Sequence, residues 1–196
     1  MRLPPLPSPA EPLTAEQMAR RVVGDRPAEV TAPITVSPYN PEWPAVYARE
    51  EARIRSALGA RVLAVEHVGS TAVPGLAAKD RIDIDLIVAD PAAEDAYVPA
   101  LAATGYTLRT REPHWYEHRC LWDADHSVNL HVFGPDCDEY LRHVIFRDWL
   151  RAHPDDRQRY AARKFQVAAE NPLSMAHYVA GKGRIVVEIL QRAGLR

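Results

Sequence analysis

The chain has 196 residues, enough for one domain with a sizeable core or a core domain with a helical extension. Its net charge of −2 provides no overall basic field, which argues against nucleic acid as a partner. No apolar run approaches the roughly 20 residues of a membrane span, so we expect no membrane partner. Cys120 and Cys137 are the only cysteines and indicate no disulfide framework, so we expect a cytoplasmic protein.

The N-terminal 30 residues differ in composition from the rest. Residues 1–13 contain five prolines, which favour an extended tail. Thr14 and Gln17 form a capping-box pattern that predicts a short helix over 14–25, followed by a linker. We therefore expect one domain over 31–196, with a sheet core over about 31–135 and a helical segment over about 136–196.

Hydrophobic periodicity predicts the elements of the sheet core. Residues 34–36 read as a short strand before a Pro/Asn turn, and residues 42–59 read as an amphipathic helix that ends at Gly59. Apolar alternation predicts strands over 61–68 and 81–89, joined by the loop 69–80. A helix is expected over 91–105 and a third strand over 106–111.

The remaining pattern changes from strands to helices. Residues 115–122 and 128–133 alternate across the turn 123–127, which predicts a β-hairpin. From Asp138 onward the pattern is helical, with breaks at Pro154 and near Pro172. The whole order indicates an α/β (or α+β) fold, a mixed β-sheet flanked by helices with a helical C-terminal third.

Two aspartates lie in a strand that is otherwise apolar. Asp83 and Asp85 alternate with three apolar residues, Ile82, Ile84 and Leu86. Residues two apart share a face and lie about 7 Å apart along it, so the carboxylates should repel and one pKa should rise. A divalent cation with oxygen ligands, Mg²⁺ or Mn²⁺, would resolve that conflict and keep positions for phosphate. The alternative is a solvated sheet face with nothing bound.

A glycine–serine turn precedes this strand. Gly69 permits a sharp turn and a close backbone approach, while Ser70, followed by Thr71, offers a hydroxyl and an N–H to phosphate. The order of strand, Gly-Ser, short spacer and Asp-x-Asp strand resembles the nucleotidyltransferase superfamily. That resemblance implies that the turn holds a triphosphate and that Asp83 and Asp85 hold the metal that bridges it.

Longer segments are similar to the GrpB family. They are ITVSPYNPEWPAVYAREEARI, EHVGSTAVPGLAAKDRIDIDLIV, NLHVF, FRDWLRAHPDDRQRYAARK and YVAGKGRIVVEIL, which cover most of residues 34–190. The resemblance implies a nucleotidyltransferase-like fold but supplies no substrate, because most members are uncharacterised. One departure is Asp80-Arg81, where the family usually has a proline and an aliphatic residue.

The third carboxylate of nucleotidyltransferases has no counterpart in the expected neighbouring strand. Strand 128–133 instead offers Asn129 and His131. We expect His131 to act as a base or metal ligand, the alternative being an edge histidine bonded to the backbone. The missing carboxylate also leaves open a module that binds a nucleotide without turning it over.

Further histidines lie near the predicted hairpin. His114 to His118 match the inverted zinc-protease pattern H-x-x-E-H, which needs a helix, whereas Pro113 and the alternation favour a strand. A looser set of His114, His118, His126 and His131 could form a metal site or line a substrate pocket. We therefore place His114, His118, Asn129 and Tyr178 in a candidate acceptor pocket, with scattered surface histidines as the alternative.

Several cations are candidates for binding phosphate. Arg147 and Arg151 lie four residues apart on one helix face, a spacing that can clamp phosphate, although ordinary surface ion pairs have the same spacing. Lys79 could reach a phosphate from the loop after Gly75. Lys182 lies four residues after Tyr178, and Lys164 repeats that spacing after Tyr160. In nucleotidyltransferases a C-terminal helical segment often supplies such a lysine to the phosphates and an aromatic residue to the base.

These features predict a Mg²⁺-dependent nucleotidyltransferase. It would transfer a nucleotidyl group from a nucleoside triphosphate, with ATP as the expected donor, to a small-molecule acceptor or activate that acceptor as a nucleotidyl intermediate. The alternative is a catalytically degenerate module that binds a nucleotide or phosphometabolite. Ser70 and His131 should line one cleft with both aspartates. The base, the acceptor and the oligomeric state stay open.

Overall fold

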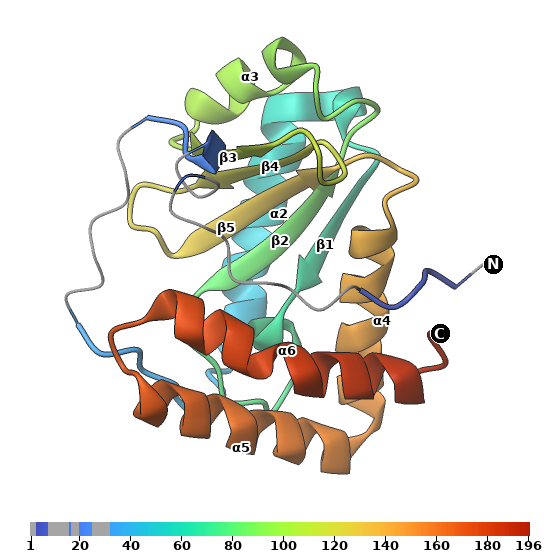
Figure 1. The fold of residues 1–196 in the computed structure, drawn as a ribbon. Coiled ribbons are helices and arrows are strands. Elements are labelled where there is room, and N and C mark those ends of the chain that lie inside the picture. Colours follow the sequence, from blue (N-terminus) through green and yellow to red (C-terminus); the bar gives the residue numbers. More distant parts are fainter. Residues whose placement is uncertain (1–2, 8–15, 17–19, 25–31) are drawn as a thin grey trace.

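A five-stranded mixed sheet forms the centre of the computed structural model, which describes residues 3–7, 16, 20–24 and 32–196 (Figure 1). The strands are β1 (Ala64–Val68), β2 (Ile82–Ile87), β3 (Thr107–Glu112), β4 (His118–Trp122) and β5 (Val128–Phe133). Their order is β1-β2-β5-β4-β3, in which β2 and β5 run parallel and all other neighbours antiparallel. The predicted mixed sheet is confirmed.

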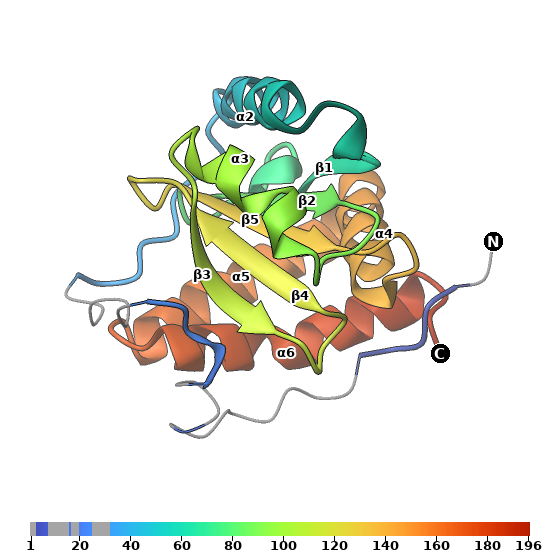
Figure 2. The same cartoon turned by 90° about the horizontal axis from the view of Figure 1, so that it is seen from above.

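Helices cover both faces of this sheet (Figures 1 and 2). On one face lie α2 (Trp43–Leu58) and the short α3 (Val98–Ala102). On the other lie α4 (Asp138–Ala152), α5 (Pro154–Glu170) and α6 (Met175–Arg192), which form the predicted helical C-terminal third. Single 3₁₀ turns occupy Gly59–Arg61, Ser70–Ala72 and Glu94–Ala96. Among the described residues, no helix combines the length and apolar character needed to cross a bilayer.

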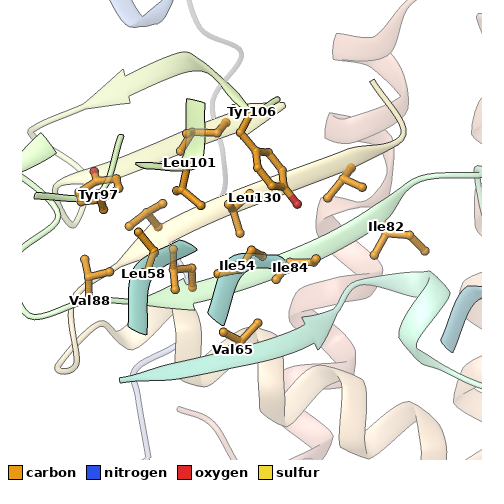
Figure 3. Packing of buried hydrophobic residues seen from close by; sticks show 14 of the residues in the cluster. Ile54, Leu58, Val65, Ile82, Ile84, Val88, Tyr97, Leu101, Tyr106 and Leu130 are labelled. Atoms are coloured by element: carbon orange, nitrogen blue, oxygen red, sulfur yellow. The ribbon is translucent and has the colours of Figure 1, made fainter. Parts of the chain in front are cut away.

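The main core lies between the sheet and α2 and α3 (Figure 3). Ile82, Ile84 and Leu86 of β2 are buried there, next to Ile54 and Leu58 of α2. Burying such a side chain contributes about 1.5–3 kcal/mol, so this alternation fixes which face of β2 points to the core. The aspartates between the three residues must therefore point to the opposite face, which is called the site face below.

Three predicted elements differ from the structure or lie mostly outside its described residues. No strand forms at 34–36: the Ile34 N–H donates to Pro172 O, and Ser37 makes only an isolated bridge with Ala78. The prediction was wrong because prolines at 33 and 38 restrict this segment to isolated contacts. The helix expected over 91–105 is reduced to a 3₁₀ turn and the five-residue α3, because Tyr97, at φ −138°, interrupts it. The helix expected over 14–25 lies mostly outside the described residues, and the proposed division near residue 30 stays a prediction.

The departure at Asp80 has a structural role. Its Oδ1 accepts a hydrogen bond of 2.7 Å from the indole Nε1 of the buried Trp43 at the start of α2. A buried indole N–H normally needs such a partner. Asp80 therefore ties the loop before β2 to α2.

Glu94 holds the α3 side to the sheet edge. Its carboxylate accepts a two-pronged bond from Arg111 of β3, at 2.6 Å for both contacts, and a 2.5 Å bond from Arg119 of β4. The Arg111 bond lowers the pKa of Glu94 most; burial opposes it, Arg119 adds to it, and the result is a pKa of about 2.

We predict that Glu94→Gln destabilises the protein by about 2 kcal/mol at pH 7, because a charge-assisted network is lost. The folded-state pKa lies below its ordinary value of 4.5, so this stabilisation is present above pH 4.5 and is lost as the pH falls toward 2. Urea unfolding at pH 7 and pH 3 measures the difference, with the exposed neighbour Asp95→Asn as control. An equal deficit at both pH values would contradict the assignment.

Candidate functional site

The glycine–serine turn packs directly against Asp83. Val68, the last residue of β1, pairs with Asp83 of β2, and Gly69 follows at φ +68°. A Cβ atom added at Gly69 would lie 2.5 Å from Oδ2 of Asp83, so a larger residue cannot take this position without displacing the carboxylate. Ser70 follows in the 3₁₀ turn, close to the buried Tyr160 of α5: burial raises the pKa of Tyr160 to about 12, and Ser70 opposes that rise. The structure thus brings the predicted turn and aspartate together.

Asp83 keeps its charge in this position. Its Oδ1 accepts a 2.7 Å hydrogen bond from Asn129 Nδ2 and lies 3.9 Å from His131 Nε2. Burial raises the pKa of Asp83, but His131, Asn129 and the charge of Lys79 outweigh it and lower the pKa to about 2. The pKa rise expected from repulsion between the aspartates is therefore not found at Asp83. Its side chain remains 32% exposed and can meet a ligand.

Asp85 is more enclosed. It is fully buried, and its Oδ2 accepts a 2.8 Å hydrogen bond from His143 Nδ1 of α4. Burial lowers the pKa of His143, but Asp85 and Glu139 raise it to about 10, so the imidazole is charged at neutral pH. The other oxygen, Oδ1, has no hydrogen-bond partner among the described residues. A histidine, which the sequence analysis did not select, thus neutralises the second aspartate.

A chain of hydrogen bonds reaches the site from the sheet edge. Glu112 Oε2 on β3 lies 2.8 Å from His118 Nδ1, and His118 Nε2 lies 3.0 Å from His131 Nδ1. Burial lowers the pKa of His118 to about 4. Burial also opposes a charge on His131, but Cys120 and Asp83 raise the pKa of His131 well above its ordinary value. The predicted His131 therefore lies beside Asp83, oriented by His118.

Three lysines gather on the α5–α6 side of Asp83. They are Lys79 in the loop before β2, Lys164 on α5 and Lys182 on α6, the only lysines in the chain. Their contacts are with uncharged groups: Met175 Sδ for Lys79, Ala77 O for Lys164, and the rings of Tyr178 and Tyr160. No carboxylate of the described residues forms an ion pair with them.

Burial and mutual repulsion disfavour the charged lysines. Burial lowers the pKa of Lys79 to about 8, helped by the charges of Lys182 and Arg81. Burial, together with the charge of Lys182, lowers the pKa of Lys164 to about 7. Burial lowers the pKa of Lys182 to about 8, although the charge of Asp83 acts in the opposite direction. An anion placed among these amines would favour their charged forms and raise their pKa values again.

A close helix crossing brings two of these lysines together. A Cβ atom added at Gly181 of α6 would lie 2.6 Å from Cγ1 of Val167 on α5. The missing side chain lets the two helices approach at this point, next to Lys182 and one turn from Lys164. Gly181 is therefore a structural requirement of the lysine cluster.

Tyr178 and Thr71 are placed differently from the prediction. Tyr178 is only 1% exposed, with Lys182 Nζ 4.4 Å and Lys79 Nζ 5.3 Å from its ring centroid. It supports the lysines and cannot line an acceptor pocket or stack on a base. Thr71 is buried, and its hydroxyl lies 3.0 Å from His67 Nε2. It therefore stabilises the glycine–serine turn and does not face a ligand.

The predicted arginine clamp faces protein groups instead of an open site. Arg147 bonds Glu66, Asp148 and the His67 carbonyl, and is buried. Arg151 donates twice to Ala72 O, at 2.8 and 3.0 Å. Both guanidinium groups are occupied in holding α4 to β1 and to the turn that follows it. We therefore withdraw them from the phosphate-binding set and assign them to positioning that turn.

The remaining histidines do not converge. His114 is exposed in the turn 113–117, whereas His118 begins β4, so the H-x-x-E-H segment is not helical. His126 lies in the β4–β5 turn against the Trp122 ring. The looser four-histidine set therefore reduces to His118 and His131, and the zinc-protease alternative is excluded by the local structure.

The donor set suits a hard cation but is incomplete. Asp83 and Asp85 share the site face, and the unpartnered Oδ1 of Asp85 is a buried oxygen that a cation would satisfy. Within the part of the chain that is described, no group of three or more His, Cys, Asp or Glu residues is arranged to hold a metal ion. Phosphate and water would have to supply the other ligands. Two surface hollows of about 450 and 390 Å³ lie near Gly194 and Trp149, and Asp83 lines neither of them.

Comparison with known proteins identifies the family. The model of the GrpB protein family matches residues 33–192. The chain belongs to the GrpB family. A UPF0157 protein of Halalkalibacterium halodurans is 48% identical over 182 residues, which are 93% of each chain. The crystal structure of the conserved protein GrpB from Enterococcus faecalis has 31% identity and a TM-score of 0.72, over 81% of this chain and 98% of that one.

Another relative is longer. A Mycolicibacterium paratuberculosis protein named dephospho-CoA kinase is 36% identical over 177 residues, which are 77% of this chain and 44% of that protein. The GrpB chain thus spans less than half of that relative.

Sequence reasoning missed two parts of the site. His143 was not selected because its partner Asp85 is 58 residues away and no motif links them. Lys164 was noted only for its spacing, although lysine's rarity was visible: 24 residues are Lys or Arg, and only three are Lys. That imbalance is the signal that could have drawn attention to all three.

We predict that Gly69→Ala is more damaging than Gly75→Ala. Both glycines have a positive φ, of 68° and 78°, so each substitution costs about 1–2 kcal/mol in backbone strain. Only Gly69 faces Asp83, whereas nothing lies within 4 Å of a Cβ atom at Gly75, so Gly69→Ala should cost about 1–3 kcal/mol more. Guanidinium unfolding of both variants measures this, and equal losses would show that the close contact is unimportant.

Proposed function

We propose that this GrpB protein is a Mg²⁺-dependent nucleotidyltransferase that uses a nucleoside triphosphate, with ATP as the expected donor, and a small-molecule acceptor. The observation that carries the proposal is the lysine cluster. Lys79 and Lys182 lie within the electrostatic influence of Asp83, Lys164 lies within that of Lys182, and none of these three lysines, the only ones in the sequence, has a carboxylate ion-pair partner among the described residues. Such a cluster is suited to a ligand with several negative charges, as in a triphosphate.

The donor phosphates would lie along the turn. Gly69 lets the backbone approach, and Ser70 offers its hydroxyl and N–H. Lys79 and Lys182 are partly exposed and would each meet a phosphate oxygen. Lys164 is only 1% exposed and bonded to Ala77 O, so it would fix the loop and add positive potential without direct contact.

Asp83 and Asp85 would hold the cation on the site face. Bound Mg²⁺ would offset the charge of the phosphates and polarise the α-phosphoryl group. Asn129 holds Asp83 Oδ1 and orients the carboxylate, and His143 does the same for Asp85. These bonds preset the geometry in which the donor would be held.

The transfer itself would be a displacement at the α-phosphorus. An acceptor hydroxyl or amine forms the new bond to phosphorus, and the bond to the bridging oxygen of the β-phosphate breaks. Pyrophosphate leaves with that electron pair, next to Lys79 and Lys182. The acceptor proton passes to the neutral form of His131, whose Nε2 faces Asp83. A carboxylate acceptor would follow the same course without transferring a proton: its oxygen would bond to the α-phosphorus, pyrophosphate would leave, and an acyl nucleotide would result.

The binding-module alternative has an observation in its favour. In the free protein Asp85 is paired with a charged His143, and the raised pKa of His131 leaves little of the neutral base. Among the described residues, no third His, Cys, Asp or Glu joins the two aspartates in an arrangement that could hold a metal ion, and Glu66, which pairs with Asp85 across β1 and β2, is bonded to Arg147. A protein that binds the nucleotide through the lysines and releases it unchanged would have this arrangement too.

We predict metal-dependent pyrophosphate release that is lost in Asp83→Asn. The wild type is incubated with ATP, Mg²⁺ and an acceptor panel that includes dephospho-CoA, because a longer relative is named for that substrate's kinase. Asp83→Asn should reduce release by a factor of about 100 or more, as expected when a group that supports charge development is removed. The exposed Asp136→Asn is the matched control and should retain the wild-type rate.

Retained ATP binding without release across the panel would favour the binding module. Absence of both would overturn the proposed function altogether. If Asp83→Asn binds ATP more tightly than the wild type and without metal dependence, the result would also support the binding module. In that module Asp83 would only offset the positive charge of the lysines.

We predict that ATP binding weakens as the pH rises through about 8. Lys79 and Lys182, each with a pKa of about 8, lose their charge in that range, and only charged amines attract phosphate. Lys182→Gln should weaken binding about 10- to 100-fold at pH 7, since a charge-assisted bond is lost. Calorimetry between pH 6.5 and 9 measures both effects, with Arg184→Gln as control because that side chain is 93% exposed. A flat profile in the wild type would count against phosphate at the lysines.

A further inference from the structure

The acceptor side of the site follows from the order of groups along β2. The glycine–serine turn and the lysines lie at the Asp83 end, where Val68 pairs with Asp83. Attacking and leaving oxygens of a phosphoryl displacement lie roughly in line. If pyrophosphate leaves toward the turn, as the proposed function requires, the acceptor must approach from the opposite direction. That direction leads along the site face past His131, whose side chain stays 24% exposed, toward the end of β5 at Phe133, while Asp85 and Phe133 themselves are buried.

An exposed aromatic pair lies at that end of the site face. Trp115 and Tyr116, in the β3–β4 turn, are 39% and 38% exposed. The Trp115 ring centroid is 5.1 Å from that of His118 and 6.0 Å from that of Phe133. His118 in turn is hydrogen-bonded to His131. The aromatic pair is therefore connected through one histidine to the residue beside Asp83.

The backbone of this turn is held in an uncommon conformation. Tyr116 and Glu117 are consecutive non-glycine residues with φ near +54° and +51°, which costs about 1–3 kcal/mol for each residue. Arg142 donates to the Tyr116 hydroxyl at 3.3 Å, and Arg119 donates to the Glu117 carbonyl at 2.7 Å. The sheet and α4 thus both hold the turn in the form that presents Trp115 outward.

The charges around the turn are already paired. Glu112 bonds His118 and Arg21, Glu139 bonds Arg142, and Glu117 bonds Arg119. No unpaired carboxylate among these residues would select a cationic acceptor. Two aromatic rings surrounded by neutralised groups suit a flat, uncharged ring.

We propose that Trp115 and Tyr116 form the acceptor-binding wall of this GrpB protein, and that the acceptor carries an uncharged heteroaromatic ring together with the hydroxyl that is modified, as a nucleoside does. The proposal rests on the proposed function for its direction of attack. The wall itself is a binding site whose existence can be measured without turnover.

The test is binding of adenosine by calorimetry in the presence of saturating α,β-methylene-ATP and Mg²⁺, which keep the donor position filled. Trp115→Ala should weaken adenosine binding about tenfold or more, because a base–aromatic stack is lost. Trp115→Phe keeps a ring and should recover most of the affinity. Phe165→Ala is the matched control, since Phe165 is an exposed aromatic residue (48%) on α5 and should leave the affinity unchanged. Ribose, which lacks the ring, should bind weakly to all variants.

The outcomes separate this inference from the proposed function. Weakened adenosine binding in Trp115→Ala, with unchanged binding of α,β-methylene-ATP, supports the wall even if no acceptor is ever turned over. Unchanged adenosine binding in Trp115→Ala overturns it, even if pyrophosphate release is observed. Equal binding of ribose and adenosine would overturn the heteroaromatic class. Thermal unfolding of each variant verifies that the exposed substitutions leave the fold intact.

Discussion

The close contact between the Gly69 backbone and the Asp83 carboxylate governs the rest of this structure. It joins the end of β1 to the first site residue of β2 with no room for a side chain between them. A carboxylate so enclosed needs donors, and Asn129 and His131 of the parallel neighbour β5 supply them. The pairing of β1, β2 and β5 therefore determines which residues surround that carboxylate. The polar groups of the site follow from sheet register.

Much of this arrangement was predictable because it depends on short-range rules. The alternation of Ile82, Ile84 and Leu86 determines the core face of β2 and, by the two-residue period of a strand, the face of both aspartates. The glycine–serine turn lies close in the sequence to the strand that it serves, so its motif could be read directly. The helical third follows from periodicity interrupted at Pro154.

The parts that were not predictable depend on contacts distant in the sequence. Arg147 and Arg151 have the spacing of a phosphate clamp, but only the fold shows that β1 and its turn supply their acceptors. Tyr178 has the spacing of a base-stacking residue, but it is buried in a cluster with residues of α5 and of the segment 34–36. His143 pairs with Asp85 through the packing of α4 on the sheet, which no local pattern encodes. Sequence spacing identifies the residues that share one face of a helix or strand. The groups that this face contacts are determined by the tertiary structure.

The rarity of lysine has a chemical consequence. Amine-directed reactions such as acetylation, reductive methylation or Schiff-base formation with an aldehyde require an uncharged amine. In this chain every side-chain amine belongs to Lys79, Lys164 or Lys182, and each has a pKa lowered toward neutrality. The many other basic groups are arginines, which these reactions do not modify. Among side chains, any such reaction is therefore confined to these three residues, which lie where α5, α6 and the loop before β2 meet.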